Sequence, residues 1–242
     1  MILIADGGST KVDWVLLNEN KKVEKRLNSK GINPSILSKQ DILERLNENS
    51  DLSSIKEKVK EIYFYGAGCG SVEQSKNLDE AFADFFTNAS RNIKEDTYAA
   101  VYATSPNEKG IVCIIGTGSN SCFYDGKLVR NNIPSLGYIL MDEGSGNHLG
   151  KILLQDYSYK KMPSTLRKQF EDEFDLNIDV IKDNLYKKEN PNQYLASFAK
   201  FLLSHSNTEY IKAIIKKAFT DFINNKVLTY CLLYTSPSPR DA

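Results

Sequence analysis

The chain has 242 residues, of which 41% are apolar and 26% charged, which is typical of an ordinary globular protein. Lysine plus arginine and aspartate plus glutamate each number 31, so the formal net charge is zero. This balance gives no electrostatic reason to expect nucleic acid or an anionic membrane as a partner. The length allows two modest domains or one large domain.

The N-terminus and the cysteines favour a cytoplasmic protein. A short apolar run, residues 1–5, meets Asp6 with no basic segment before it, unlike a signal peptide. The longest uncharged stretch, residues 110–124, contains glycines and is too short to span a bilayer. The four cysteines show no Cys-x-x-Cys spacing, so we expect reduced thiols.

Apolar periodicity in the first part of the chain predicts strands alternating with helices. Trp14 lies in the second strand and is expected in the core. Strands are predicted at residues 1–5, 12–17, 21–28 and 62–65, and helices at 39–48, 52–60, 72–92 and 96–104.

The second part begins with a similar strand pattern and then becomes helical. A strand, a glycine turn and two further strands occur here as they do at the N-terminus, which indicates a duplicated fold. The strand at residues 110–115 is the most apolar of the chain and is expected to be buried. Strands are predicted at residues 110–115, 121–124 and 127–130, and helices at 151–158, 162–174, 192–204 and 209–224.

The last segment, residues 231–242, differs from the rest of the chain. It has no helical period and contains a Ser-Pro-Ser-Pro block. The segment resembles a translated sequencing-adapter artefact, and the alternative is a natural disordered tail. We exclude it from fold prediction and expect that the natural protein continued past this point.

Four glycine-centred segments lie at predicted strand ends or helix starts. Taken alone, each fits an ordinary turn, and DGGST fits a plain β-hairpin. Together they indicate a cleft lined by backbone amides, which suit phosphate oxygens. The segments are DGGST (6–10), GAGCG (66–70), GTGSNS (116–121) and DEGSG (142–146).

The ordered set DGGSTK, GINPS, YGAGC, IIGTGSNS and SLGYILMDEGSGNHLGK resembles the N-acetylglucosamine kinase branch of the BadF/BadG/BcrA/BcrD ATPase family. This family belongs to the sugar kinase/Hsp70/actin superfamily. The resemblance implies an α/β, ribonuclease H-like (actin/hexokinase-type) fold with a cleft between two duplicated mixed-sheet domains. The expected domains are residues 1–107 and an incomplete second domain, 108–230.

The resemblance implies ATP and Mg²⁺ as cofactors. Asp6 would hold Mg²⁺, usually through water, because a hard cation needs oxygen ligands. Lys11 would add positive charge, or would simply be an exposed lysine at a strand edge. The residues expected to bind ATP phosphates are Gly7, Gly8, Ser9, Thr10 and Lys11 in the first loop and Gly116, Thr117, Gly118 and Ser119 in the second.

Asp96 occupies the position of the catalytic base in the family. A carboxylate at hydrogen-bond distance can accept the proton of an attacking sugar hydroxyl. Two alternatives remain: Asp96 only complements the dipole of the helix that it begins, or neighbouring Glu95 is the base.

The resemblance also implies a sugar site. Asn33 of GINPS and Asp142 of MDEGSG match its hydrogen-bonding residues, and Ser135, Leu136 and Gly137 match a stretch beside the carboxylate. Leu136 stands where an aromatic residue is common in the family. Without the resemblance, Asn33 is equally well a turn residue before proline. Cys69 in YGAGC is expected to be a small buried residue.

The expected function is ATP-dependent phosphorylation of a sugar, with the 6-hydroxyl of an N-acetylated hexosamine as the acceptor. Two alternatives stay open. One is the other branch of the family, ATPases that drive electron transfer through an iron–sulfur cluster held by paired cysteines of two subunits. Cys113 and Cys122 lie in strands predicted to be buried, which disfavours that branch. The other alternative is a non-catalytic sugar sensor or an actin-like assembly protein, which would not need the base Asp96.

No adenosine-binding segment and no final helix of the superfamily type precede Cys231. We therefore expect this chain to bind ATP poorly. The sequence leaves the oligomeric state open, with a homodimer as one form.

Overall fold

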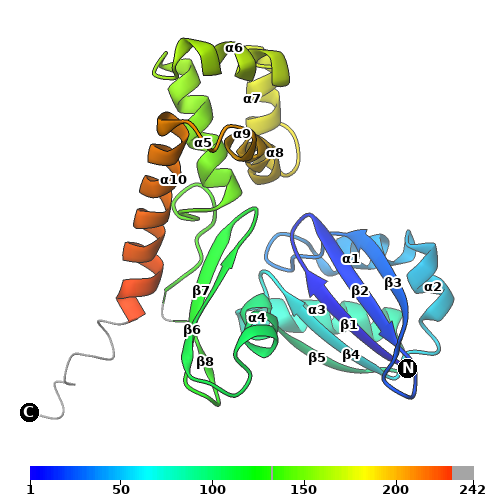
Figure 1. The fold of residues 1–242 in the computed structure, drawn as a ribbon. Helices are drawn as coiled ribbons and strands as arrows, with labels where there is room; N and C mark the ends of the chain where they lie inside the picture. Colours follow the sequence, from blue (N-terminus) through cyan, green and yellow to red (C-terminus); the bar gives the residue numbers. More distant parts are fainter. Residues whose placement is uncertain (132, 231–242) are drawn as a thin grey trace, which may run out of the picture. The chain divides into compact units, whose positions relative to one another are not determined.

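The computed structural model describes residues 1–131 and 133–230. The chain divides into two compact units, Met1–Pro106 and Asn107–Ala242, and Figure 1 shows the elements of each. The domain boundary after residue 107 stays a prediction. The predicted artefact tail, residues 231–242, lies outside the described residues.

The first unit is built on a five-stranded mixed sheet with the order β3-β2-β1-β4-β5. The β1–β2 and β2–β3 pairs are antiparallel, whereas β4 runs parallel to both β1 and β5. Fully buried residues alternate with partly buried ones along most of β2, because successive side chains point to opposite faces of the sheet. The strands are β1 (Ile2–Gly7), β2 (Lys11–Leu17), β3 (Val23–Lys30), β4 (Glu61–Gly66) and β5 (Ser90–Glu95).

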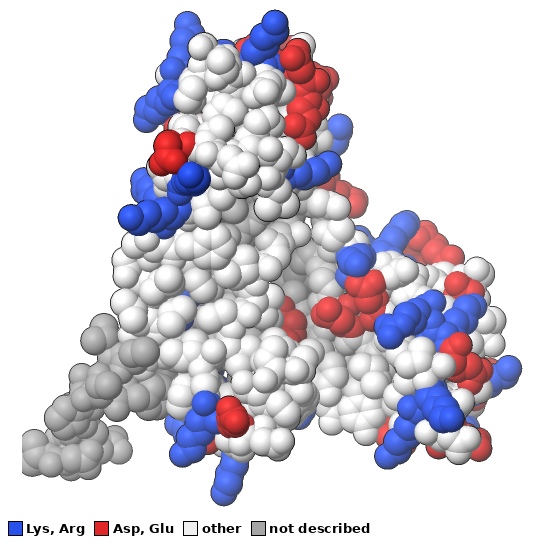
Figure 2. Space-filling view, viewed as in Figure 1, with Lys and Arg blue, Asp and Glu red and all other residues white. Residues whose placement is uncertain are grey.

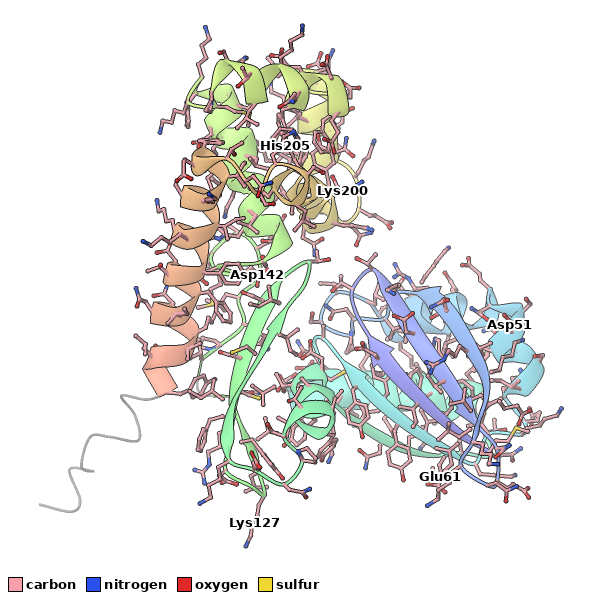
Figure 3. All side chains as sticks on the ribbon, viewed as in Figure 1. Asp51, Glu61, Lys127, Asp142, Lys200 and His205 are labelled. Carbon is pink, nitrogen blue, oxygen red and sulfur yellow. The ribbon has the colours of Figure 1, made fainter. Side chains whose placement is uncertain are left out.

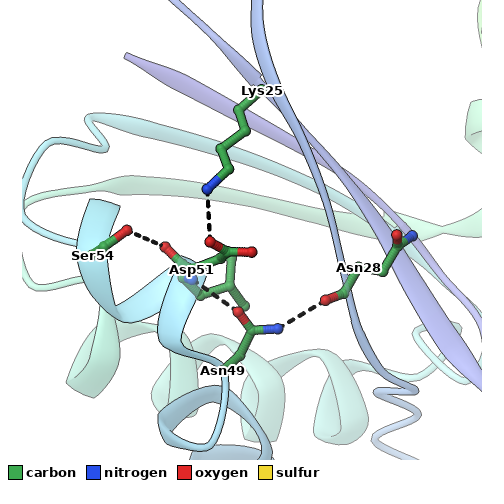
Figure 4. Close-up of polar contacts among 6 residues, drawn as sticks. Lys25, Asn28, Asn49, Asp51 and Ser54 are labelled. Carbon is green, nitrogen blue, oxygen red and sulfur yellow. Dashed lines mark hydrogen bonds and ion pairs between the residues drawn. The ribbon is translucent and has the colours of Figure 1, made fainter.

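Four helices accompany this sheet, and polar residues mark where they begin. Ser38 and Asp41 form a reciprocal capping box at the start of α1. The side chain of Asn49 accepts from the backbone N–H of Leu52 at the start of α2 and donates to the carbonyl of Asn28 at 2.8 Å (Figure 4). The helices are α1 (Lys39–Asn47), α2 (Ser50–Ile55), α3 (Val72–Phe85) and α4 (Asp96–Thr104).

Trp14 lies at the centre of an aromatic core, as the sequence predicts. It is 1% exposed, and its ring centroid lies 6.0 Å from Phe64, 6.1 Å from Phe82 and 6.5 Å from Phe86. Its indole nitrogen donates to the hydroxyl of Ser29 at 2.9 Å, which satisfies the one polar atom of the ring. This core packs between α3 and the sheet that positions the loops described below.

Two predicted helices of the first unit are wrong in extent. The helix predicted over 72–92 ends at Phe85, and residues Ser90–Glu95 form strand β5 at the sheet edge. An edge strand pairs on one side only, and the polar sequence SRNIKE lacks the apolar alternation that predicts a strand. The helix predicted over 52–60 ends at Ile55, and by Lys60 the backbone N–H donates to the carbonyl of Met1 instead of to a helical carbonyl.

The second unit begins with an antiparallel sheet of order β6-β7-β8. The strands are β6 (Gly110–Ile115), β7 (Ser119–Tyr124) and β8 (Val129–Arg130). Burial of β6 was expected, but Cys113 is exposed and Ile115 is 45% exposed. Successive side chains of a strand point to opposite faces, so an apolar run alone does not ensure that both faces of β6 are covered.

The rest of the second unit is helical. Phe170, Phe198 and Phe201 form the centre of its core together with Leu153 of α5. Helix α7 was not predicted, and none of its residues is fully buried. The helices are α5 (Gly146–Ser158), α6 (Ser164–Glu173), α7 (Ile178–Tyr186), α8 (Pro191–Ser197), α9 (Ala199–Ser204), α10 (Glu209–Phe222) and the π-helix η1 (Ile223–Val227).

Acidic and basic side chains are interspersed on the face drawn in Figure 2, in agreement with the zero net charge. No helix in the described ranges combines the length and the apolar character needed to cross a membrane.

Candidate active site

The carboxyl ends of the parallel strands bring three predicted segments together in the first unit. Gly7 of β1 pairs with Gly66 of β4, which pairs with Glu95 of β5. The DGGST turn, the GAGCG loop and the start of α4 at Asp96 therefore follow one edge of the sheet. Ligand sites of open α/β sheets occur at this edge, so the register supports the grouping that the sequence predicts.

The DGGST turn leaves backbone donors free. The amide of Gly8 donates to the carbonyl of Lys11 at 2.9 Å and is therefore used inside the turn. The amides of Ser9 and Thr10 find no acceptor within the described part of the chain. Lys11 is exposed and forms an ion pair with Asp13 at 2.7 Å, which fits the alternative of a lysine at a strand edge.

Asn33 fastens the GINPS turn to the DGGST turn. Its Nδ2 donates to Ser9 Oγ at 2.8 Å, and its Oδ1 accepts from the backbone N–H of Ser35 at 2.9 Å. Gly68 of the GAGCG loop has φ +79°, and a Cβ at this position would lie 1.9 Å from Asn33 Oδ1. Glycine is needed at residue 68 both for this φ and for the close approach. Asn33, Ser9 and Gly68 therefore form one contiguous group.

Asp96 begins α4 and is partly buried. Burial raises the pKa of its carboxyl group and the negative charge of Asp6 raises it further, while the backbone N–H groups of Thr97 and Asp96 oppose the shift. Loss of surrounding water also raises the pKa of Asp6, with a further contribution from Asp13. A carboxyl group with a raised pKa beside a second carboxyl group is typical of acid–base sites.

Two neighbours of Asp96 clarify its surroundings. The carboxylate of Glu95 packs against Gly70, where a Cβ would lie 2.1 Å from Glu95 Oε1. The hydroxyl of Thr97 is buried and has no hydrogen-bond partner in the described residues.

Cys69 is 5% exposed, and burial together with the charges of Asp96 and Glu95 raises its pKa to about 12. Its thiol therefore stays protonated, in agreement with the expected inert role.

The GTGSNS turn of the second unit repeats this pattern of free amides. The amide of Gly116 donates to the carbonyl of Gly118 at 2.9 Å inside the turn, whereas those of Thr117 and Gly118 have no acceptor among the described residues. Both phosphate loops predicted from the sequence thus carry two consecutive unpaired N–H groups. Oriented amides of this kind form anion-binding nests.

Ser119 is already engaged within its own unit. It is 4% exposed, its hydroxyl donates to the carbonyl of Glu143 at 2.7 Å, and its backbone N–H donates to Asp142 Oδ1 at 3.2 Å. The carbonyls of Gly116 and Thr117 accept from the first amides of α5. These bonds hold the loop against the DEGSG segment.

Asp142 is buried in the left-handed region, with φ 72° and 7% exposure. It lies between the β6–β7 hairpin and the start of α5 (Figure 3). Oδ2 accepts from Asn147 Nδ2 at 2.9 Å, and a Cβ on Gly118 would lie 2.8 Å from the same oxygen. The predicted sugar carboxylate therefore contacts the second phosphate loop.

The stretch Ser135–Gly137 lies in irregular structure ahead of Asp142, and it is followed by a turn at residues 138–140. Leu136 is 56% exposed, and Gly137 has φ 75° with its carbonyl accepting from Met141 at 2.8 Å. The side chain of Lys151 reaches back to the carbonyl of Tyr138 at 3.2 Å. The predicted role of this stretch in sugar binding remains a prediction.

Asn147 was not singled out from the sequence. Its side chain is 1% exposed and bonded to Asp142, whereas most asparagines near helix starts are exposed or cap the helix. The only signal in the sequence is that Asn147 lies five residues after Asp142. Whether the two side chains meet depends on the turn between them, which the spacing does not specify.

The described residues contain no cluster of three or more His, Cys, Asp or Glu side chains able to hold a metal ion. Mg²⁺ does not need such a cluster, because it keeps several waters and binds one or two carboxylates together with substrate phosphates. Asp6 lies near the carboxyl end of β1, which leads into the turn that carries the free amides of Ser9 and Thr10, and this arrangement fits that requirement.

Solved structures resemble this chain over most of its length. A candidate N-acetylglucosamine kinase of Porphyromonas gingivalis is 35% identical, with a TM-score of 0.88 over 95% of this chain and 82% of that one. A candidate N-acetylglucosamine kinase of Chromobacterium violaceum is 18% identical, with a TM-score of 0.65 over 93% of this chain and 81% of that one. A comparison with curated proteins gives no match.

A ROK family glucokinase of Streptomyces griseus, solved with glucose and AMPPNP, shares the fold at 12% identity. Its TM-score is 0.53 over 93% of this chain and 90% of that one. The mixed five-stranded sheet and these likenesses define a sugar kinase fold of the actin/hexokinase type. Residues 5–225 match the BadF/BadG/BcrA/BcrD ATPase family, and the chain belongs to that family. Membership implies ATP as the nucleotide.

Proposed function

We propose that the protein transfers the γ-phosphoryl group of ATP to a sugar hydroxyl, with the 6-hydroxyl of N-acetylglucosamine or a related N-acetyl hexosamine as acceptor. The observation that carries the proposal is the placement of Asp96 and Asp6 at one sheet edge beside the free amides of Ser9 and Thr10. The likeness at 35% identity to a candidate N-acetylglucosamine kinase supports the choice of sugar.

Asp96 is the general base in this proposal. Its carboxylate accepts the proton of the sugar hydroxyl as that oxygen attacks the γ-phosphorus; the bond from this phosphorus to the β-phosphate oxygen breaks, and ADP leaves. A raised pKa suits a base, because proton transfer is most efficient when the pKa approaches the working pH. Glu95 is the weaker candidate, since its carboxylate packs against Gly70.

The free amides of both loops would hold the phosphates. Ser9 and Thr10 in one unit and Thr117 and Gly118 in the other can donate to phosphate oxygens without rearrangement of the turns. Mg²⁺ held at Asp6 would neutralise charge on the transferred group. Phosphoryl transfer depends mainly on such positioning and charge compensation, so preformed donors are the expected contribution of the protein.

Asn33 and Asp142 would bind the sugar hydroxyls. The Asn33 amide both donates and accepts, and its orientation is set by Ser9 and Ser35 before any ligand arrives. Among the described residues, each oxygen of the Asp142 carboxylate accepts from one donor, which leaves lone pairs for hydroxyl donors.

The test is an ATP-coupled assay that follows ADP and sugar phosphate with N-acetylglucosamine, N-acetylmannosamine and glucose as acceptors. We expect sugar-dependent ADP formation that Asp96→Asn reduces about a hundredfold or more. ATP hydrolysis independent of any sugar would instead support the electron-transfer ATPase branch, for which the exposure of Cys113 removes one objection. Sugar binding without turnover would support a sensor.

A further inference from the structure

Asn147 contacts both the candidate sugar carboxylate and the candidate phosphate loop of the second unit. Its Nδ2 donates to Asp142 Oδ2 at 2.9 Å, and its Oδ1 accepts from the hydroxyl of Ser145 at 3.1 Å. Its backbone N–H donates to the carbonyl of Thr117 at 3.0 Å. Every polar group on the side chain of this buried residue is directed at DEGSG.

The capping of α5 does not account for the Asn147 side chain. Ser145 is the N-cap, and its hydroxyl accepts from the backbone N–H of His148 at 3.3 Å. The first amide of the helix, that of Gly146, has no partner inside the helix and donates to the carbonyl of Gly116 at 2.9 Å. The helix start is therefore satisfied without the amide group of Asn147, whose charged partner is Asp142.

Asp142 transmits that contact to the loop. Its Oδ1 accepts the backbone N–H of Ser119, while its Oδ2 accepts the Asn147 amide. A carboxylate offers about four lone-pair sites, so these two bonds fix its plane and leave one site on each oxygen for a ligand. A rotation of the carboxylate would change the bond to Ser119, and with it the turn that carries the free amides of Thr117 and Gly118.

We propose that Asn147 is a positioning residue that couples ligand binding at Asp142 to the conformation of the Thr117–Ser119 loop. The inference rests on the proposed function, in that it takes a sugar hydroxyl as the ligand of Asp142 and ATP phosphate as the ligand of the loop. With Asn147 in place, a sugar finds the carboxylate oriented and a phosphate finds the loop formed. Each ligand then favours the arrangement that the other requires.

The first measurement is amide hydrogen exchange of Ser119 in the ligand-free chain. Asn147→Ala removes one of the two donors that hold the Asp142 carboxylate among the described residues, and that carboxylate accepts the Ser119 N–H, so we expect the variant to accelerate this exchange about tenfold or more. Asn184→Ala is the matched control, since Asn184 donates to the carbonyl of Val180 on α7 of the same unit. The control should leave Ser119 exchange unchanged. Unchanged exchange in Asn147→Ala overturns the inference.

The second measurement is the ratio of N-acetylglucosamine dissociation constants without and with Mg²⁺ and a non-hydrolysable ATP analogue. We expect a ratio well above one in the wild type and a ratio close to one in Asn147→Ala. A purely structural role would lower thermal stability and leave this ratio unchanged. A wild-type ratio of one overturns the coupling, whereas absence of sugar phosphorylation alone overturns the proposed function.

A further variant keeps the test decisive if Asn147→Ala folds poorly, and a double-mutant cycle tests whether Asn147 acts through Asp142. Asn147→Ser retains a small donor, so it should fold and should restore part of the coupling. In a double-mutant cycle, Asn147→Ala should have no further effect on Ser119 exchange once Asp142→Ala is present. An equal effect in both backgrounds would show that Asn147 does not act through Asp142.

Discussion

The amide nitrogen of Asn33 donates to the hydroxyl of Ser9 at 2.8 Å, which joins two turns that lie 24 residues apart in the sequence. The other end of the same amide accepts from Ser35, and Gly68 leaves the space that Oδ1 occupies. The candidate sugar residue is thus held by the loop that would bind phosphate. Four predictions concern this unit, and the three that compare variants of single residues each have a matched control.

Asn33→Ala should raise the KM for the sugar about tenfold or more, because it removes a hydrogen-bonding group fixed in place before the sugar binds. Steady-state kinetics with N-acetylglucosamine measure this effect. Asn49→Ala is the control: it removes the cap of α2, which should cost about 1 kcal/mol of stability, and it should leave KM unchanged. Equal KM values in all three proteins would exclude Asn33 from the sugar site.

Asp96→Asn should lower kcat by about two orders of magnitude or more while the fold is retained, because the amide cannot accept the hydroxyl proton. Kinetics at saturating ATP and sugar measure the loss. Asp51→Asn, which removes an exposed ion pair with Lys25 (Figure 4) and an acidic residue from the first turn of α2, should leave kcat unchanged. Full activity in Asp96→Asn would refute the assignment of the base.

The raised pKa of Asp96 also predicts the pH dependence of stability. A carboxyl group whose pKa is higher in the folded state binds its proton more tightly there, so its contribution is fully present below the unfolded pKa of about 3.9. That contribution is lost as the pH rises through the folded pKa. Asp96→Asn should therefore be more stable than the wild type at neutral pH, and the difference should shrink in acid. Thermal unfolding across the pH range measures it, and a variant less stable than wild type at pH 7 contradicts it.

Gly68→Ala should destabilise the protein more than Gly126→Ala. Both glycines have positive φ, so each substitution carries the backbone cost of about 1 kcal/mol. At residue 126 the nearest atom to a Cβ is 3.6 Å away, whereas at residue 68 it would overlap Asn33 Oδ1 at 1.9 Å. Chemical denaturation of both variants measures the free energy of unfolding. Equal losses of stability would show that the Asn33 side chain moves aside without an energetic cost.

Lys226 offers a prediction in the second unit. It is 1% exposed, and its ammonium contacts the sulfur of Met141 at 3.6 Å, a weak acceptor for a desolvated charge. Lys226→Met keeps most of the side-chain volume and removes the charge, so the midpoint of thermal unfolding should stay the same or rise. A fall of several degrees would instead indicate that the ammonium stabilises the fold, which its contact with the Met141 sulfur does not explain.

Much of the fold follows from local patterns. The sequence predicts strand β2 from its alternating apolar residues and helix α3 from its apolar face. Both patterns arise because each element buries one side against the same core. Strand β5 was missed because an edge strand in the sequence SRNIKE does not need apolar alternation. The exposure of Cys113 was missed because an apolar run does not report whether a neighbour covers it.

For the candidate site, the sequence alone determined the family, the segments that carry the chemistry and the residue types at Asp6, Asp96 and Asp142. Only the tertiary structure decided which amides stay free, since the turns consume those of Gly8 and Gly116 and leave their neighbours unpaired. The hydrogen bonds of Asp142 with Ser119 and Asn147 are likewise known only from the structure. The physical reason is that hydrogen bonds between distant segments depend on distance and direction, which residue type and spacing along the chain do not specify.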